Sequence, residues 1–84
     1  RRGGESVALG SADEALFERL RGWRADIAKE HGVPPYVVFH DTTLRAIAQA
    51  RPASLDALRA ISGVGERKLE NYGAAIVRIV AGGD

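Results

Sequence analysis

The chain has 84 residues, 45% of them hydrophobic, and a formal net charge of +1 at pH 7. This length has room for one domain with a modest core. The lack of cysteine excludes disulfides and thiolate metal sites and is typical of a reducing cytoplasm. No apolar run approaches the ~20 residues that a membrane span needs, and the start of the chain has no signal-peptide pattern. We therefore expect a soluble, cytoplasmic domain that makes no contact with a membrane.

The charge is close to neutral, which does not by itself indicate phosphate binding. Of the twelve cationic side chains, only Lys29 and Lys68 are lysines. Arginine is suited to bidentate phosphate contacts and to stacking on bases. The abundance of arginine and alanine is equally typical of a GC-rich genome, so the composition alone leaves both interpretations open.

Residues 1–10 contain three glycines and show no periodicity. We interpret them as a flexible linker and expect a single helical domain over residues 11–84. The glycines at 82 and 83 are expected to end its last helix.

A first helix is predicted over residues 12–31. Ser11 and Glu14 have the spacing of a capping box, and Gly32 is a natural C-cap. Apolar side chains recur at spacings of four, three and four on one face: Leu16, Leu20, Trp23 and Ile27. Trp23 is therefore interpreted as a core residue, and Phe17, at the edge of this face, as cover for the core.

Residues 33–39 read Val-Pro-Pro-Tyr-Val-Val-Phe, a pattern that locally favours a strand. The rest of the chain offers no partner strand. We therefore expect an extended or single-turn segment whose apolar side chains fill the core.

A second helix is predicted to be capped by Asp41. We expect it to end near Ala50, because Pro52 disfavours helical geometry at Arg51.

Ser54 is expected to cap a third helix, with Leu55, Leu58 and Ile61 facing the core. A turn at residues 63–65 precedes a fourth helix over 66–72. Gly73 interrupts the apolar pattern, which resumes over 74–81 as a fifth helix. The fold class predicted is all-α, with five helices and no sheet.

The Gly-Val-Gly turn at residues 63–65 has the form of a helix-hairpin-helix motif. Glycines in that motif leave backbone N–H groups facing outward at a helix N-terminus, where they can hold a DNA phosphate. Arg67 and Lys68 would add charge. The alternative is a helix corner that needs glycine only for its backbone freedom. A P-loop is excluded, because the Gly-Lys-Ser/Thr signature and a preceding strand are absent.

We expect no catalytic residue, no metal site and no cofactor in this chain. His31 and His40 have no carboxylate cluster at metal-ligand spacing around them. The serines are explained as helix caps or turn residues, without a motif that would place a base beside them. The chain is therefore interpreted as a binding module rather than an enzyme.

Tyr36 follows two prolines, which fix the approach of the backbone. A tyrosine held in this way can present its ring for stacking on single-stranded bases. The alternative is a ring wedged between the first two helices with only its hydroxyl at the surface.

Three motifs together resemble the HRDC domain, found in RecQ-type DNA helicases and in ribonuclease D. They are the Val-Pro-Pro-Tyr-Val-Val-Phe segment at 33–39, Asp-x-Thr-Leu at 41–44, and Ile-x-Gly-Val-Gly-x-x-Lys-Leu-Glu-x-Tyr-Gly at 61–73. The resemblance covers about residues 12–81 and is closest to the bacterial RecQ form. It implies a compact five-helix bundle with an extended Val-Pro-Pro-Tyr segment between the first two helices.

The resemblance also implies an auxiliary module that modulates how a helicase engages single-stranded, forked or junction DNA. Tyr36 would belong to the DNA-binding surface. The candidate phosphate contacts are Arg24, Lys29, Arg51, Arg67 and Lys68. The alternative for Lys68 is a role in helix packing or a carboxylate partner. The near-neutral charge predicts weak, salt-sensitive binding.

The parent implied is an ATP-dependent 3′–5′ DNA helicase of the bacterial cytoplasm, associated with the nucleoid. The domain itself is expected to be monomeric. One alternative is a regulatory module that docks on the helicase core or on neighbouring HRDC domains. The other is the RNA-binding HRDC domain of a ribonuclease D.

Overall fold

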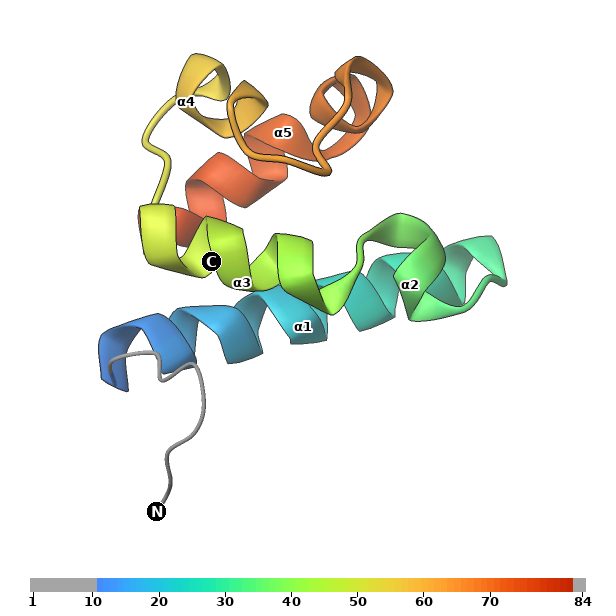
Figure 1. Ribbon diagram of the computed structural model, residues 1–84. Coiled ribbons are helices and arrows are strands. Elements are labelled where there is room, and N and C mark those ends of the chain that lie inside the picture. Colours follow the sequence, from blue (N-terminus) through green and yellow to red (C-terminus); the bar gives the residue numbers. More distant parts are fainter. Residues whose placement is uncertain (1–10, 83–84) are drawn as a thin grey trace.

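The computed structural model describes residues 11–82, and within this range all of its regular secondary structure is helical. The helices are α1 (Ser11–His31), α2 (Pro35–Val38), α3 (Asp41–Ala50), α4 (Leu55–Arg59) and α5 (Glu66–Val80). Figure 1 shows α3 lying along α1, with α2 close to the C-terminal part of α1, and with α4 and α5 stacked over this layer. The predicted all-α class is confirmed. The linker predicted for residues 1–10 lies outside the described residues.

The core lies where the helices meet. Its fully buried large side chains come from α1, the end of α2, α3, α4 and α5: Leu20, Phe39, Leu44, Ile47, Leu58 and Ile76. Within residues 11–82, no helix is both long enough and apolar enough to cross a bilayer.

The α1 helix confirms the range predicted from its apolar periodicity. It ends in a Schellman motif: the Val33 N–H donates to the carbonyl of Ala28 at 3.0 Å, and the Gly32 N–H to that of Lys29 at 3.2 Å. Gly32 has a φ of +66°, which favours glycine. The predicted capping box involves Ser11, whose side chain is outside the described part of the structure.

Phe17, predicted to cover the edge of the core, is itself part of the core, with only 5% of its surface exposed. The Arg45 guanidinium lies 4.9 Å from the centre of its ring. This cation–π contact covers the outer edge of the α1–α3 interface.

The α3 helix begins differently from the prediction. Its N-cap is His40, which makes no side-chain cap hydrogen bond, and Asp41 is the first helical residue rather than the cap. The helix ends at Ala50, as expected. Arg51 then adopts a left-handed conformation, with a φ of +49°, and its N–H donates to the Ile47 carbonyl at 2.9 Å.

The α4 helix has the predicted cap, because the Ser54 Oγ accepts a hydrogen bond from the Ala57 N–H at 3.1 Å. Leu58 is fully buried. The prediction that Leu55 faces the core is wrong: 46% of its surface is exposed.

The α5 helix is continuous through Gly73, so the predicted break between a fourth and a fifth helix is wrong. Gly73 is buried, and a Cβ there would lie 2.8 Å from Leu55 Cδ2 and 3.2 Å from Leu69 Cδ1. The glycine therefore allows α4 to approach α5 closely. The count of five is reached instead because residues 35–38 form a helix of their own.

Candidate nucleic-acid interface

The α2 turn presents an apolar surface to solvent. Its N-cap, Pro34, is extended with φ −64° and ψ 149°, and the second proline occupies the first helical position. Tyr36 is 61% exposed and Val37 is 48% exposed. We call the exposed residues Pro34, Pro35, Tyr36 and Val37 the α2 patch. The α2 patch thus faces solvent, whereas the next two residues, Val38 and Phe39, are buried in the core.

Lys68 holds the α2 turn against α5. Its Nζ donates to the Val37 carbonyl at 3.0 Å and to the Val38 carbonyl, and it lies 5.1 Å from the centre of the Phe39 ring. A helix of four residues cannot satisfy its own C-terminal carbonyls, and the ammonium supplies the missing donors. Lys68 was predicted as a phosphate contact. Its inward placement favours the alternative, a role in helix packing, and makes it a positioning residue.

Arg24 anchors the segment from the other side. It is only 7% exposed, and its Nη1 lies 2.9 Å from the Phe39 carbonyl oxygen and 2.7 Å from Asp41 Oδ1. Its Nε is buried without a hydrogen-bond partner among the described residues. A guanidinium held in this way is turned away from a ligand at the surface, so the geometry does not favour the predicted phosphate contact of Arg24.

Three aromatic rings support the segment from below. Trp23 and Tyr72 meet edge to face with their centres 5.7 Å apart, and Phe39 lies 5.8 Å from Tyr72 and 6.2 Å from Trp23. Together with Lys68 and Arg24, these contacts fix the position of the backbone that carries Tyr36.

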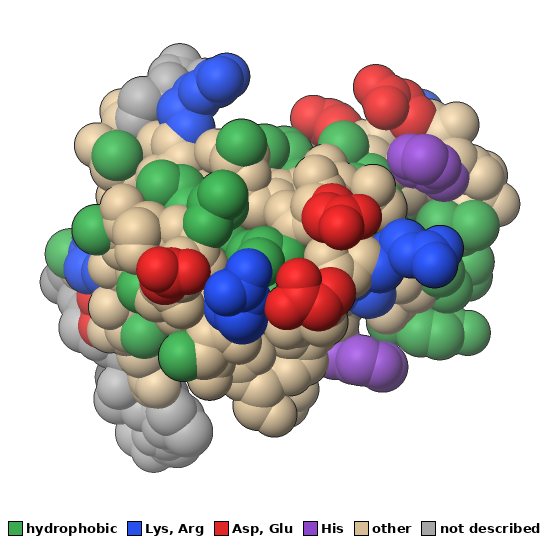
Figure 2. Space-filling view, turned by 90° about the horizontal axis from the view of Figure 1, so that it is seen from above, with side chains coloured by type: hydrophobic (Ala, Val, Ile, Leu, Met, Phe, Trp, Pro, Cys, Tyr) green, Lys and Arg blue, Asp and Glu red, His purple; other side chains and the backbone are tan. Residues whose placement is uncertain are grey.

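His40 is a surface residue whose contribution sequence reasoning missed. Its imidazole stacks against the Tyr36 ring, with 6.0 Å between the centres and 24° between the planes. Both rings are exposed. The spacing of four residues was a weak signal, because the helix ends between the two. Figure 2 shows the histidine side chains at one end of the molecule, beside exposed hydrophobic groups and a cation.

The three remaining predicted phosphate contacts differ in their surroundings. Lys29 and Arg67 are exposed and form no ion pair within residues 11–82. Arg51 pairs with Asp13 at 3.0 Å and lies at the far end of α3 from α2, a helix about 15 Å long. Lys29 and Arg67 are therefore the better candidates for phosphate contacts near Tyr36.

A carboxylate, that of Glu66, directly follows the Gly-Val-Gly turn between α4 and α5. Gly65 is the N-cap of α5, and Glu66 follows as the first helical residue. Glu66 accepts from Arg59 at 3.0 Å across the turn. A carboxylate at this helix N-terminus competes with a phosphate for the same positive field. The geometry thus favours the interpretation of this turn as a structural corner.

The Arg24–Asp41 pair predicts a pH dependence of stability. The hydrogen bond from Arg24, with its positive charge, holds the pKa of the Asp41 carboxyl below its usual range, although burial opposes the shift. A carboxyl with a lower pKa in the folded state stabilises the fold above its unfolded pKa of about 3.9, and this contribution is lost as the pH falls through the folded pKa. We expect Asp41→Asn to be less stable than wild type near neutral pH and the difference to shrink from about pH 5 to pH 2. Urea denaturation across this range measures it, and parallel curves would contradict it.

No group of three or more metal-binding side chains lies together among the described residues.

The model of the HRDC domain family matches residues 13–80. The chain belongs to the HRDC family. The resemblance inferred from its three motifs is thereby confirmed.

Relatives of this HRDC domain include two kinds of bacterial DNA helicase. The ATP-dependent DNA helicase UvrD2 of Mycobacterium tuberculosis is 51% identical over 70 residues, which are 83% of this chain and 10% of the helicase. The ATP-dependent DNA helicase RecQ of Bacillus subtilis is 49% identical over 69 residues, which are 82% of this chain and 12% of the helicase. The chain thus spans about a tenth of these relatives. UvrD2 was not among the parents suggested by the motifs.

A solved structure confirms the fold. The third HRDC domain of Deinococcus radiodurans RecQ superimposes with a TM-score of 0.81 and 36% sequence identity. The match covers 86% of this chain and 95% of that domain.

Proposed function

We propose that this HRDC domain is an auxiliary DNA-binding module of a bacterial ATP-dependent DNA helicase, and that it engages single-stranded segments through the α2 patch. The observation that carries the proposal is the 61% exposure of Tyr36 on a backbone fixed by two prolines and by Lys68. A rigid, exposed ring can stack on a base with little loss of side-chain entropy. The relatives' designation as DNA helicases supports DNA rather than RNA as the partner.

In this proposal, Tyr36 and His40 form one stacking platform and Lys29 and Arg67 contact the phosphates. Two phosphate contacts on a single strand give a slope of about −1.4 for the logarithm of affinity against the logarithm of salt concentration. The affinity should then fall about sevenfold between 50 and 200 mM salt. Arg67→Gln should reduce the magnitude of the slope by about 0.7.

Removal of the Tyr36 ring is expected to weaken DNA binding about tenfold, since stacking contributes roughly 1–3 kcal/mol per base. Stability should be unchanged, because the ring is exposed. Fluorescence anisotropy with a labelled oligothymidylate at low salt measures the affinity of wild type, Tyr36→Ala and Tyr36→Phe. The phenylalanine variant keeps the ring and should bind like wild type.

Leu55→Ala is the matched control, because Leu55 is also an exposed apolar residue but lies on α4, away from the α2 patch. It should bind DNA like wild type. Unchanged binding by Tyr36→Ala would refute the stacking role. If wild type itself shows no saturable binding at low salt, the DNA-binding proposal fails for this domain and docking on protein becomes the better hypothesis.

A further inference from the structure

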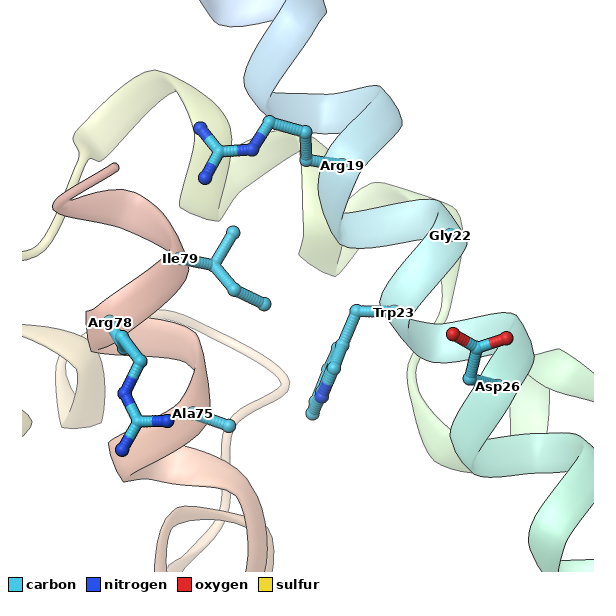
Figure 3. Close-up of a pocket in the computed structure, with 7 residues that line it drawn as sticks. All are labelled: Arg19, Gly22, Trp23, Asp26, Ala75, Arg78 and Ile79. Carbon is cyan, nitrogen blue, oxygen red and sulfur yellow. The ribbon is translucent and has the colours of Figure 1, made fainter. Parts of the chain in front are cut away.

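An open groove of about 480 Å³ runs between α1 and α5. Figure 3 shows the Trp23 indole standing between the two helices, with Ile79 pointing towards it from α5. The residues used below are Arg19, Gly22, Trp23, Asp26, Arg78 and Ile79. No residue of the α2 patch lines this groove, so it is separate from the proposed DNA surface.

Gly22 is not required by the fold. A glycine in a helix interior is less favourable than alanine by about 1 kcal/mol. A Cβ at Gly22 would meet nothing within 4 Å, and its φ is not in the left-handed region. The missing side chain does, however, leave the groove open beside Trp23. An unfavourable residue that packing does not explain, located in the lining of a groove, points to an occupant.

The rims of the groove carry unpaired positive charge. Arg19 from α1 and Arg78 from α5 are exposed, and neither forms an ion pair with the part of the chain that the structure describes. Figure 3 shows Arg19 reaching towards the C-terminal part of α5. Asp26 is the single acidic group in the lining. The combination of an apolar floor and two cations suits an apolar side chain flanked by carboxylates.

The remaining contacts favour a peptide over a nucleic acid. Trp23 is half-buried and packs against the rings of Phe39 and Tyr72, which limits the ring surface open for a base. The Asp26 carboxylate can accept hydrogen bonds from peptide N–H groups. A phosphodiester backbone has no N–H donors for this carboxylate.

We propose that the α1–α5 groove is a docking site for an acidic peptide segment of a partner protein that carries one apolar side chain. The apolar side chain lies against Trp23 and Ile79, and its neighbouring carboxylates pair with Arg19 and Arg78. The domain would thereby hold a protein partner on one surface while the α2 patch remains free.

The test is a titration of the 84-residue chain into a fluorescein-labelled peptide with one leucine between runs of aspartate, at low salt. Anisotropy measures binding. Trp23 is the only tryptophan, so its emission reports directly on the groove. We expect saturable binding, a matching change in emission, and loss of both when the peptide leucine is replaced by serine.

Three variants locate the site. Gly22→Leu should abolish binding while the helix is retained, because leucine is a good helix former and would fill the groove. Arg78→Gln should weaken peptide binding about three- to fivefold. Arg67→Gln, which removes the same charge elsewhere, should leave it unchanged. DNA binding, in contrast, should be weakened by Arg67→Gln and unchanged by Arg78→Gln.

The absence of saturable peptide binding, or binding unaffected by Gly22→Leu, would overturn the proposal. An oligothymidylate that changes Trp23 emission with the same dependence on Arg78 would also overturn it, since the groove would then be a second nucleic-acid site.

Discussion

Replacement of Gly63 by alanine is expected to lower the free energy of unfolding by about 3 kcal/mol, which corresponds to a fall of about 15 °C in Tm. Gly63 has a φ of +95°, where a side chain strains the backbone. A Cβ there would also overlap the Thr43 side chain, which is buried on α3. Thermal denaturation followed by circular dichroism measures the loss.

The neighbouring glycine is the control for this prediction. Gly65 has a φ of −83°, and a Cβ there would meet nothing within 4 Å. Gly65→Ala should therefore lower the free energy of unfolding by about 1 kcal/mol or less, the effect of a poorer N-cap. Combining Thr43→Ala with Gly63→Ala should recover the steric part of the loss but not the backbone part. Equal effects of the two glycine substitutions would contradict this account of the turn.

Arg24→Met is expected to lower the free energy of unfolding by about 2 kcal/mol, because it removes a charged donor from a buried carbonyl. The Phe39 carbonyl and the Asp41 carboxylate both depend on Arg24 Nη1. Methionine keeps much of the apolar stem, so the loss reports on the polar contacts. Urea denaturation gives the change in stability.

The same variant separates a structural role from a DNA contact. Below its Tm, folded Arg24→Met should bind oligothymidylate like wild type, whereas Arg67→Gln should bind more weakly without loss of stability. An Arg24→Met variant as stable as wild type but defective in DNA binding would restore Arg24 to the interface.

The elements that could be predicted are those governed by neighbours in sequence. The four-three-four spacing on α1 and the Ser54 cap depend on residues within a few positions of one another, and both predictions are confirmed. The family could be predicted because three motifs occur together in one order. Tyr36 could be singled out because the two prolines before it are themselves a local signal.

What the sequence did not reveal includes contacts between distant segments. Lys68 reaches a carbonyl 31 positions away, and Arg24 reaches one 15 positions away. A sequence shows that these side chains are charged but not that their charge is turned inward. The sequence pattern predicts a helix break at Gly73, because the residue that Gly73 contacts, Leu55, lies on another helix. A glycine in a helical pattern can end a helix or allow a second helix to approach closely, and the position of the second helix decides between the two.

The location of DNA on the surface is the most direct test of the proposed function. The chain is small enough for amide-resolved NMR, and a 15N-labelled sample titrated with an oligothymidylate of about 12 nucleotides at low salt would report on each backbone N–H. We expect the largest shift changes at Tyr36, Val37 and His40, with smaller ones at Lys29 and Arg67. Changes concentrated along the α1–α5 groove, or none at saturating DNA, would contradict the assignment of the α2 patch as the DNA-binding surface.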